Sequence, residues 1–392
     1  MVEKWFITAK RERVMRIENS VTNKNKILED ELNILLSSKH SLNKKRIKDF
    51  FSYLLLSIVG ITMLLPFLWM VSTSLKDPSE VFSYPPRWLP SEITYYLGNK
   101  EEQIAIRKLA ILKDEKIKIK IINSGEVRVV AAEEVKSEWK LNIVWENYPK
   151  AWKLIRFGRG YLNTIFIATM VTFGQVVTSS MAAYAFARLN FPLRDKLFFA
   201  YLATMMIPRD VTMIPVFILL KKLPEFLNYI FHTQFWKADL FLFGSYVGKP
   251  VGIDSYFALI MPGFFSAYGT FMLRQFFMSI PVDLEDAAKI DGCSFFGVYR
   301  KIILPLSKPA LATLTTFTFM GSWRDFLWPL IIANSQELMP LQILLQSFQG
   351  FYGTEWTLLM AGSIIVLFPI IIVFIFNQRF FIEGIQLGAI KG

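Results

Sequence analysis

Long apolar runs divide this 392-residue chain into candidate membrane-spanning helices. A helix needs about 20 mostly apolar residues to cross the hydrocarbon core of a bilayer. Four uncharged runs are long enough, at residues 50–75, 160–187, 255–273 and 356–378. Two further runs, 197–220 and 309–333, each contain adjacent residues of opposite charge, Arg209-Asp210 and Arg324-Asp325. The pattern predicts an all-α polytopic membrane protein with six transmembrane helices, in which we expect each Arg-Asp neighbour pair to neutralise its own charge.

The connection between the first two spans, residues 76–159, has a different pattern. Lysine and isoleucine alternate strictly over Lys116–Ile121, and Glu126–Val129 alternates again. Strict alternation in two runs separated by a turn is typical of a β-hairpin. With a third strand from Gln103–Leu112, it predicts a small β-containing insert at about residues 98–140. This insert either takes part in function or only solubilises the connection.

Basic residues predict how the chain is oriented, because short cytoplasmic loops are enriched in Lys and Arg. A basic leader at residues 1–49 precedes the first span, and the loops 188–196 and 274–308 are also basic. The loop 334–355 has no Lys or Arg, whereas the loop 221–254 has four lysines and departs from the rule. We therefore expect both termini in the cytoplasm and the connection after the first span outside, with a permease core over residues 160–392.

Composition excludes most other classes of protein. The chain is 53% hydrophobic and 19% charged, so its excess of 44 Lys and Arg over 32 Asp and Glu indicates basic membrane-protein loops rather than nucleic-acid binding. One cysteine and two histidines cannot form a His/Cys zinc site. The sequence has no P-loop, HExxH or GxSxG motif. We expect no catalytic residue, no metal and no cofactor, hence a protein that is not an enzyme.

The loop after the fourth span predicts two short helices. Pro281 begins the first, and Asp283, Glu285 and Asp286 complement its positive N-terminus. Its predicted apolar face consists of Leu284, Ala287, Ala288 and Ile290. Gly292 ends this helix, and a second helix, Phe295–Ile303, is expected to stop at Leu304-Pro305. The pair is either a compact peg for a groove on another protein or an ordinary helical hairpin packed under the bundle.

This loop resembles the EAA coupling motif of binding-protein-dependent ABC importers, EAAxxDG followed by IxLPLxxP. The chain reads Asp286-Ala287-Ala288-Lys289-Ile290-Asp291-Gly292 and then Ile302-Ile303-Leu304-Pro305-Leu306-Ser307-Lys308-Pro309. Asp286 stands where the family has Glu, one methylene longer. The maltose-type carbohydrate permease branch is also similar at Phe271–Phe277, at Trp323–Leu330 in place of WNxFLWPL, and at Gly384–Gly392. The resemblance runs from about Phe51 to Gly392 and misses the leader, the β-containing insert and a segment near 224–250.

The resemblance implies a transport subunit that forms half of a translocation pathway for a sugar or oligosaccharide. Its implied partners are a second homologous permease, two ATP-binding cassette ATPase subunits, an exterior solute-binding protein and the lipid of the cell membrane, with no nucleic acid. The implied ATPase-coupling residues are Asp286, Ala287, Ala288, Asp291, Gly292, Leu304 and Pro305. Arg324, Asp325, Trp323 and Trp328 are candidates for the pathway; alternatively, Arg324 and Asp325 belong to an interhelical ion pair or a helix end.

Two other classes of protein remain as alternatives. A secondary active solute transporter would need no ATPase and typically has broken helices in inverted repeats, a symmetry that is not visible in this sequence. A scaffolding membrane protein has no reason to carry the coupling loop. Neither the sugar nor the partner permease can be named from this chain.

Overall fold

The structure, a computed structural model, describes residues 48–83, 86–97, 104–111, 116–121, 126–131, 135–242, 244–350 and 353–389. The chain separates into two compact units, Met1–Trp69 and Met70–Gly392. The predicted basic leader lies outside the described residues except for its last two. The fold class is confirmed, because four helices are long and apolar enough to cross a membrane, or six if each of two bent helix pairs counts as one span. The four unbroken candidates are Lys48–Ser74, Phe157–Arg188, Tyr256–Met278 and Trp356–Gln378.

The first of these helices, Lys48–Ser74, is apolar on every side. Its large side chains from Phe50 to Leu68 are exposed. Within it, the Thr62 hydroxyl donates a hydrogen bond to the Ile58 carbonyl oxygen at 2.8 Å, so this polar group needs no other partner in lipid. A helix with this all-round apolar surface is suited to a lipid environment.

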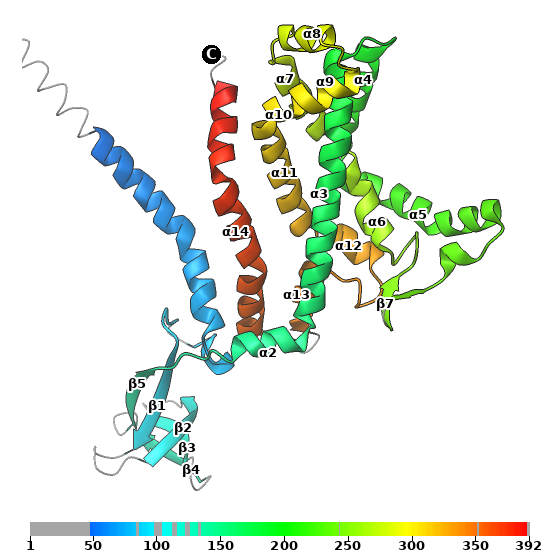
Figure 1. Ribbon diagram of the computed structural model, residues 1–392. Helices are drawn as coiled ribbons and strands as arrows, with labels where there is room; N and C mark the ends of the chain where they lie inside the picture. Colours follow the sequence, from blue (N-terminus) through cyan, green and yellow to red (C-terminus); the bar gives the residue numbers. More distant parts are fainter. Residues whose placement is uncertain are drawn as a thin grey trace, which may run out of the picture. The chain divides into compact units, whose positions relative to one another are not determined.

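The connection after this helix contains a five-stranded antiparallel sheet (Figure 1). Its strands are β1 (Ser91–Leu97), β2 (Ile104–Ile111), β3 (Lys116–Ile121), β4 (Val127–Ala131) and β5 (Val135–Leu141), in the order β4-β3-β2-β1-β5. The predicted hairpin is confirmed as the β3–β4 pair, in which Lys118 lies opposite Val129. The prediction of three strands was wrong, because β1 and β5 lack strict alternation. They pair across a long stretch of chain, with Ser91 opposite Leu141.

Hydrogen bonds fix the chain where it enters and leaves the sheet. A 3₁₀ turn, η1 (Pro78–Glu80), begins at Asp77, whose carboxylate accepts a hydrogen bond from the Ser79 amide. Helix α2 (Asn147–Leu154) follows the sheet, and the buried Asn147 amide donates to the carbonyl oxygens of Ser74 and Lys76, each at 2.9 Å. The buried Lys76 ammonium donates to the Arg87 carbonyl oxygen at 2.6 Å. These bonds satisfy backbone carbonyls that would otherwise be buried without a partner.

Helix α3 (Phe157–Arg188) is the central element of the second unit. It packs against α7 (Ala267–Met278) and α11 (Lys308–Trp323), and α11 packs in turn against α14 (Trp356–Ala389) (Figure 1). At 32 residues, α3 exceeds the length needed for a span. Its two ends therefore reach two separate sets of loops.

The first bent pair is the predicted span over 197–220. Helix α4 (Arg194–Ala203) and the 3₁₀ turn η3 (Thr204–Met206) are followed by α5 (Arg209–Phe231), and the two helical parts meet at 101°. Ile207 and Pro208 are not helical, and Pro208 lacks the amide that would continue the helix. Beyond α5 lie the 3₁₀ turn η4 (Phe235–Lys237) and a short hairpin of β6 (Leu240–Leu242) and β7 (Ser245–Gly248). The chain returns through α6 (Tyr256–Ile260) and η5 (Met261–Phe264) into α7.

The second bent pair joins the loop after α7 to α11. Helix α8 (Asp283–Ile290) is followed by α9 (Phe295–Val298), a π-turn η6 (Tyr299–Ile303) and α10 (Leu304–Leu306), which meets α11 at 79°. The expected stop at Leu304-Pro305 was therefore wrong, and the bend lies at Ser307. In the π-turn, the Leu304 amide bonds to the Tyr299 carbonyl oxygen. This wider turn accommodates Pro305 in the next position, where the missing amide costs little.

The predicted span over 309–333 consists of two helices. Helix α11 ends at Trp323, and α12 (Leu327–Ile332) begins after Arg324, Asp325 and Phe326. Helix α13 (Leu341–Gln346) and a short hairpin of β8 (Gln349–Gly350) and β9 (Gly353–Thr354) then lead into α14.

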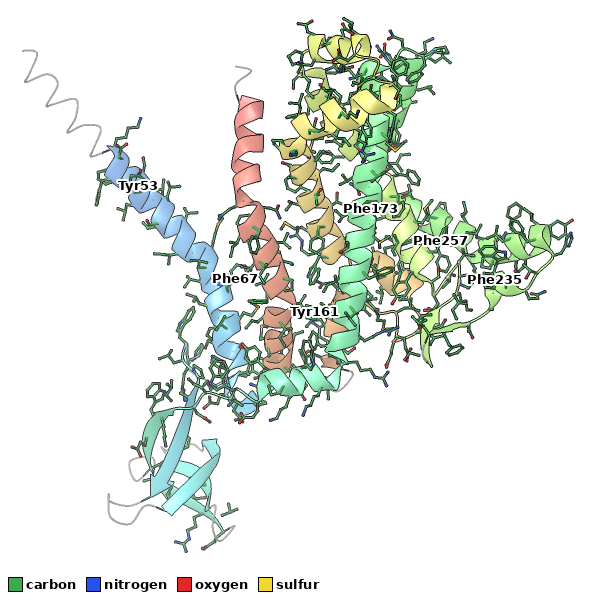
Figure 2. The ribbon with its side chains drawn as sticks, in the orientation of Figure 1. Tyr53, Phe67, Tyr161, Phe173, Phe235 and Phe257 are labelled. Atoms are coloured by element: carbon green, nitrogen blue, oxygen red, sulfur yellow. The ribbon has the colours of Figure 1, made fainter. Side chains whose placement is uncertain are left out.

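Helix α14 contains Pro369, and two neighbouring helices donate hydrogen bonds to it just before that proline. Proline has no amide hydrogen, so the carbonyl of residue 365, four residues earlier, loses its helical partner. The Tyr161 hydroxyl on α3 donates to that Ile365 carbonyl oxygen (Figure 2). The Trp323 indole Nε1 on α11 donates to the next carbonyl oxygen, that of Val366, at 3.2 Å.

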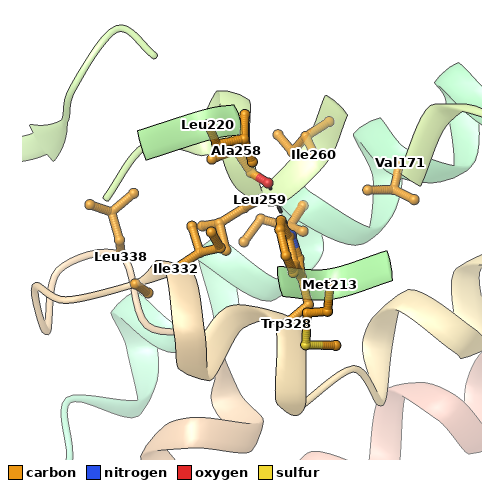
Figure 3. Close-up of a cluster of buried hydrophobic side chains, with 11 residues drawn as sticks. Val171, Met213, Leu220, Ala258, Leu259, Ile260, Trp328, Ile332 and Leu338 are labelled. Carbon is orange, nitrogen blue, oxygen red and sulfur yellow. Dashed lines mark hydrogen bonds between the residues drawn. The ribbon is translucent and has the colours of Figure 1, made fainter. Parts of the chain in front are cut away.

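Buried apolar side chains form three clusters. One, drawn in Figure 3, joins α3, α5, α6 and α12 around Trp328 and Ile332. A second joins one end of α3 to the loop that contains α8, around Phe277 and Tyr299. The third joins the other end of α3 to α13 and α14, around Phe157 and Trp323. These three clusters hold the regions described next in place.

Candidate functional site

The α8 loop has a well-defined beginning and end. Three acids, Asp283, Glu285 and Asp286, lie in the first turn of α8, where they complement the helix dipole. At its other end the Gly292 amide bonds to the Lys289 carbonyl oxygen at 2.9 Å, and the Cys293 amide bonds to that of Ala288 at 2.9 Å. Gly292 has a φ of +82°, the left-handed conformation in which glycine is favoured. This is a Schellman motif, so the predicted stop at Gly292 is confirmed.

The two faces of α8 differ from the predicted pattern. Glu285 and Ala288 are its buried residues, whereas Leu284 and Ala287 are exposed and Ile290 is 87% exposed. Of the four residues of the predicted apolar face, only Ala288 is therefore buried, and the other three lie on the outer face. Of the other residues implied by the coupling motif, Asp286, Asp291, Gly292 and Pro305 are exposed and Leu304 is half-buried. The Asp286 carboxylate accepts a 3.0 Å hydrogen bond from Lys289 Nζ one turn further on.

A buried ion pair attaches α8 to the end of α3. Arg188 Nε lies 2.7 Å from Glu285 Oε1, and both side chains are less than a tenth exposed. The same guanidinium donates to the carbonyl oxygens of Phe277 at 2.6 Å and Ile280 at 2.5 Å. This contact was not predicted, because in the sequence Arg188 is one of several charges in a basic loop and Glu285 is one of three acids at a helix N-terminus. The only available signal was a lone arginine at the end of a span.

Tyrosines attach the second half of the loop to α3. The Tyr299 hydroxyl and the Ser180 hydroxyl lie 2.7 Å apart, and both residues are buried. The Tyr184 hydroxyl donates to the Phe295 carbonyl oxygen at 3.1 Å. The loop is thus held on α3 at three levels, while its outer surface is left accessible.

A cavity of about 400 Å³ lies between the two predicted spans that are interrupted, 197–220 and 309–333, which are called the broken spans below. Residues from α3, α5, η5, α11 and α12 line it. Its polar side chains are Thr164, Gln175, Arg209, Thr212, Ser266, Thr318, Ser322 and Asp325. Among the lining residues that the structure describes, Arg209 and Asp325 are the only charged ones. They form an ion pair, in which Arg209 Nη2 lies 2.7 Å from Asp325 Oδ2.

The four predicted pathway residues have different places. Asp325 and Trp328 line the cavity, and the Trp328 indole donates to the Ala258 carbonyl oxygen at 3.0 Å. Trp323 is buried at 1% exposure in the third cluster, and Arg324 Nε donates to the Met320 carbonyl oxygen at 3.2 Å. The predicted alternative, an interhelical ion pair, is confirmed for Asp325, because it pairs with Arg209 of α5. The expectation that Arg324 and Asp325 neutralise one another was wrong.

A buried carboxylate organises the loops at the opposite end of α3. Asp254 Oδ1 accepts hydrogen bonds from the Asn334 amide at 2.9 Å and from both the amide and the hydroxyl of Ser335, at 3.0 and 2.9 Å. Its Oδ2 accepts one from the Tyr246 hydroxyl at 2.8 Å. Burial raises the pKa of Asp254, but these four hydrogen bonds outweigh it and hold the pKa below its usual value. No local pattern in the sequence marks Asp254.

Arg159 and Asn163, near the start of α3, bind the same loops. Arg159 donates to the carbonyl oxygens of Glu337 at 3.1 Å and Tyr246 at 3.2 Å. The Asn163 amide donates to those of Glu337 at 2.7 Å and Met339 at 3.2 Å. Within the described residues, no three His, Cys, Asp or Glu side chains gather where they could hold a metal ion.

This chain is similar to several transport proteins of one kind. The arabinooligosaccharides transport system permease protein AraQ of Halalkalibacterium halodurans is 34% identical over 230 residues, which are 59% of this chain and 73% of that protein. The sn-glycerol-3-phosphate transport system permease protein UgpE of Yersinia pestis is 31% identical over 250 residues, which are 62% and 79%. A chain of a bacterial ABC transporter that imports the acidic polysaccharide alginate has a similar fold. Its TM-score is 0.60 at 19% identity, over 86% of this chain and 97% of that one.

The family described as binding-protein-dependent transport system inner membrane component matches residues 175–384. That range contains the α8 loop and most of the residues that line the cavity. It is also more than half of the chain. This protein therefore belongs to the binding-protein-dependent transport system inner membrane components, the permease subunits of ABC importers.

Proposed function

We propose that this chain forms half of the translocation pathway of an importer for a sugar or oligosaccharide. A second homologous permease would form the other half, two ATP-binding cassette ATPases would supply the energy, and an exterior solute-binding protein would deliver the substrate. The names of relatives support a small polar substrate. They include a neutral oligosaccharide and an anionic glycerol phosphate, so the family leaves the charge of the substrate open.

The α8 loop is the part that we propose to couple transport to ATP hydrolysis. The observation that carries this proposal is the exposed outer face of α8, which is held to α3 by the buried Arg188–Glu285 pair. Asp286, Ala287, Ala288, Asp291, Gly292, Leu304 and Pro305 are the proposed coupling residues. A helix that is exposed on one side and tied to a span on the other can pass a movement of the ATPase to the pathway.

The proposed orientation follows from the two ends of α3. The end at Arg188 carries the α8 loop and the basic loops, so we place it in the cytoplasm together with both termini. The end at Phe157 carries α2, the sheet connection and the loops around Asp254, which we place outside, where a solute-binding protein would dock. The alternative of a secondary active transporter is not supported, because the chain belongs to the permease subunits of ABC importers.

The residues of the proposed pathway are Asp325 and Trp328 with Arg209. Arg324 and Trp323 are kept as weaker candidates, since Arg324 is bonded to its own helix and Trp323 is buried among aromatic rings. The polar lining of the cavity supports this proposal, because hydroxyl and amide groups can exchange hydrogen bonds with a sugar.

Purification tests the proposal directly. We expect two ATPase subunits and a second permease to co-purify with this chain from its native membrane.

A sharper test is Gly292→Asp, since residue 292 must stay left-handed and a new carboxylate there would lie beside Asp291. We expect this variant to insert normally but to lower ATP-driven uptake by about tenfold. Gly292→Asn is the matched control, because Asn has the same size, tolerates the left-handed conformation and carries no charge. Normal sugar-stimulated ATPase activity in Gly292→Asp would contradict the proposal.

A further inference from the structure

The cavity between the broken spans carries no net charge from this chain. Arg209 and Asp325 are the only charged groups among its described lining residues, and they lie 2.7 Å apart. The other polar lining groups are hydroxyls of Ser and Thr and the amide of Gln175. Gln175 is itself fixed, because its amide donates to the Thr318 hydroxyl at 3.0 Å.

The two charges come from the places where the two spans are interrupted. Arg209 is the first residue of α5, directly after Pro208, and Asp325 lies between α11 and α12. The Asp325 side chain is 20% exposed and that of Arg209 is 66% exposed. The other carboxylate oxygen of Asp325 lies 3.5 Å from the Trp328 amide, at the start of α12. Both oxygens of the carboxylate thus have partners in the protein.

An ion pair in such a site favours one class of substrate. The two charges satisfy one another, so an uncharged sugar can pass without breaking the pair and can exchange hydrogen bonds with the hydroxyl lining. An acidic sugar meets no unpaired cation among the described residues that line the cavity. To gain one, it must displace Asp325 from Arg209 and leave that carboxylate, whose side chain is 20% exposed, without its partner, which is costly. Specificity would then come from a penalty against the wrong substrate.

We propose that the Arg209–Asp325 pair makes this cavity selective for uncharged saccharides over acidic ones. This inference rests on the proposed function and narrows its substrate class. The two residues determine specificity through their charge balance, and neither has to contact the sugar directly.

The test uses the complete transporter complex in lipid nanodiscs without its solute-binding protein, so that delivery does not decide the result. Binding of arabinotriose, a neutral probe, and trigalacturonate, an acidic probe, is followed by saturation-transfer NMR. We expect the wild-type complex to bind arabinotriose and to give no signal with trigalacturonate. Asp325→Asn removes the carboxylate and frees Arg209, so we expect affinity for trigalacturonate to rise by about tenfold or more.

The double variant Arg209→Gln with Asp325→Asn separates charge balance from direct contact. It has no charge in the cavity, so we expect it to lose trigalacturonate binding again and to keep arabinotriose binding within about threefold of wild type. Glu225→Gln is the matched control. It frees Lys237 from a 2.9 Å ion pair that lies outside the cavity, and it should change neither probe.

Three results would overturn the inference. These are trigalacturonate binding to the wild type at the level of arabinotriose, no gain in Asp325→Asn, and a double variant that behaves like Asp325→Asn. Failure of the proposed function is distinguishable from all three, because it would appear as a chain that does not co-purify with ATPase subunits.

Discussion

Asp254 is a single residue that joins the β6–β7 hairpin to the loop after α12. It has a φ of +62°, which is uncommon for a residue with a side chain, and its carboxylate accepts four hydrogen bonds. A strained backbone of this kind persists only where other contacts over-determine it. Here the four donors supply those contacts. The residue therefore fixes the position of the β6–β7 hairpin against the loop that follows α12.

Substitution of Asp254 tests this role. Asp254→Ala loses all four hydrogen bonds and leaves a left-handed alanine, so we expect the free energy of unfolding to fall by about 3 kcal/mol. Asp254→Asn keeps an acceptor oxygen and a residue that tolerates this conformation, so we expect a loss of only about 1 kcal/mol. Thermal unfolding of the complex in nanodiscs measures both. Equal losses in the two variants would show that the hydrogen bonds matter little.

The lowered pKa of Asp254 gives a pH dependence with a definite sign. A carboxyl whose pKa is lower in the folded state stabilises the fold at any pH above its unfolded pKa of about 3.9. That contribution is lost as the pH falls through the folded pKa. The difference in melting temperature between wild type and Asp254→Asn should be constant above about pH 5 and shrink below about pH 4. A difference that grew on acidification would contradict this assignment.

Among the elements, α8 depends most on one contact. Its eight residues bury little apolar surface, with Ala288 as the buried apolar residue, so the Arg188–Glu285 pair supplies much of its attachment. Removing one partner of a buried pair leaves the other charge without compensation. We expect Glu285→Ala and Arg188→Ala each to destabilise the attachment of α8 by about 3 kcal/mol, and the double variant to cost clearly less than their sum. Hydrogen exchange at the α8 amides measures the effect. Additive single losses would mean that the two residues act independently.

The elements also separate what the sequence reveals from what it does not. Apolar runs locate the spans, the Lys-Ile alternation locates β3, the alternation over Glu126–Val129 locates β4, and Gly292 marks the end of α8, because each is a local property of the chain. The bends are only partly local. Pro208 accounts for the first, but the second lies at Ser307 rather than Pro305, because a π-turn absorbs the proline. Strands β1 and β5 and the Arg209–Asp325 pair depend on residues far apart in sequence, and no local pattern records them.

At the scale of the whole molecule, the sheet has the geometry of an insertion in the connection after the first span. Its first and last strands pair with one another, and the Asn142 amide bonds to the Pro90 carbonyl oxygen at 3.2 Å, so the two ends of the insertion are adjacent. Replacing residues 91–141 with a Gly-Ser linker should leave α2 and the Asn147 contacts in place. We expect the variant to assemble and to transport within about twofold of wild type. Normal assembly with lost uptake would instead give the sheet a role in transport.

The hydrogen bonds at Pro369 bear on how this molecule can move. A proline inside a spanning helix is often taken for a hinge, since the carbonyl that it frees allows the helix to flex. In α14 the Tyr161 hydroxyl occupies that carbonyl, and the Trp323 indole holds the one beside it. Flexing would strip two donors of their acceptors in apolar surroundings. We therefore expect helix α14 to stay rigid at Pro369, where α3 and α11 donate to it, and the bends at Pro208 and Ser307 to absorb any rearrangement of the subunit.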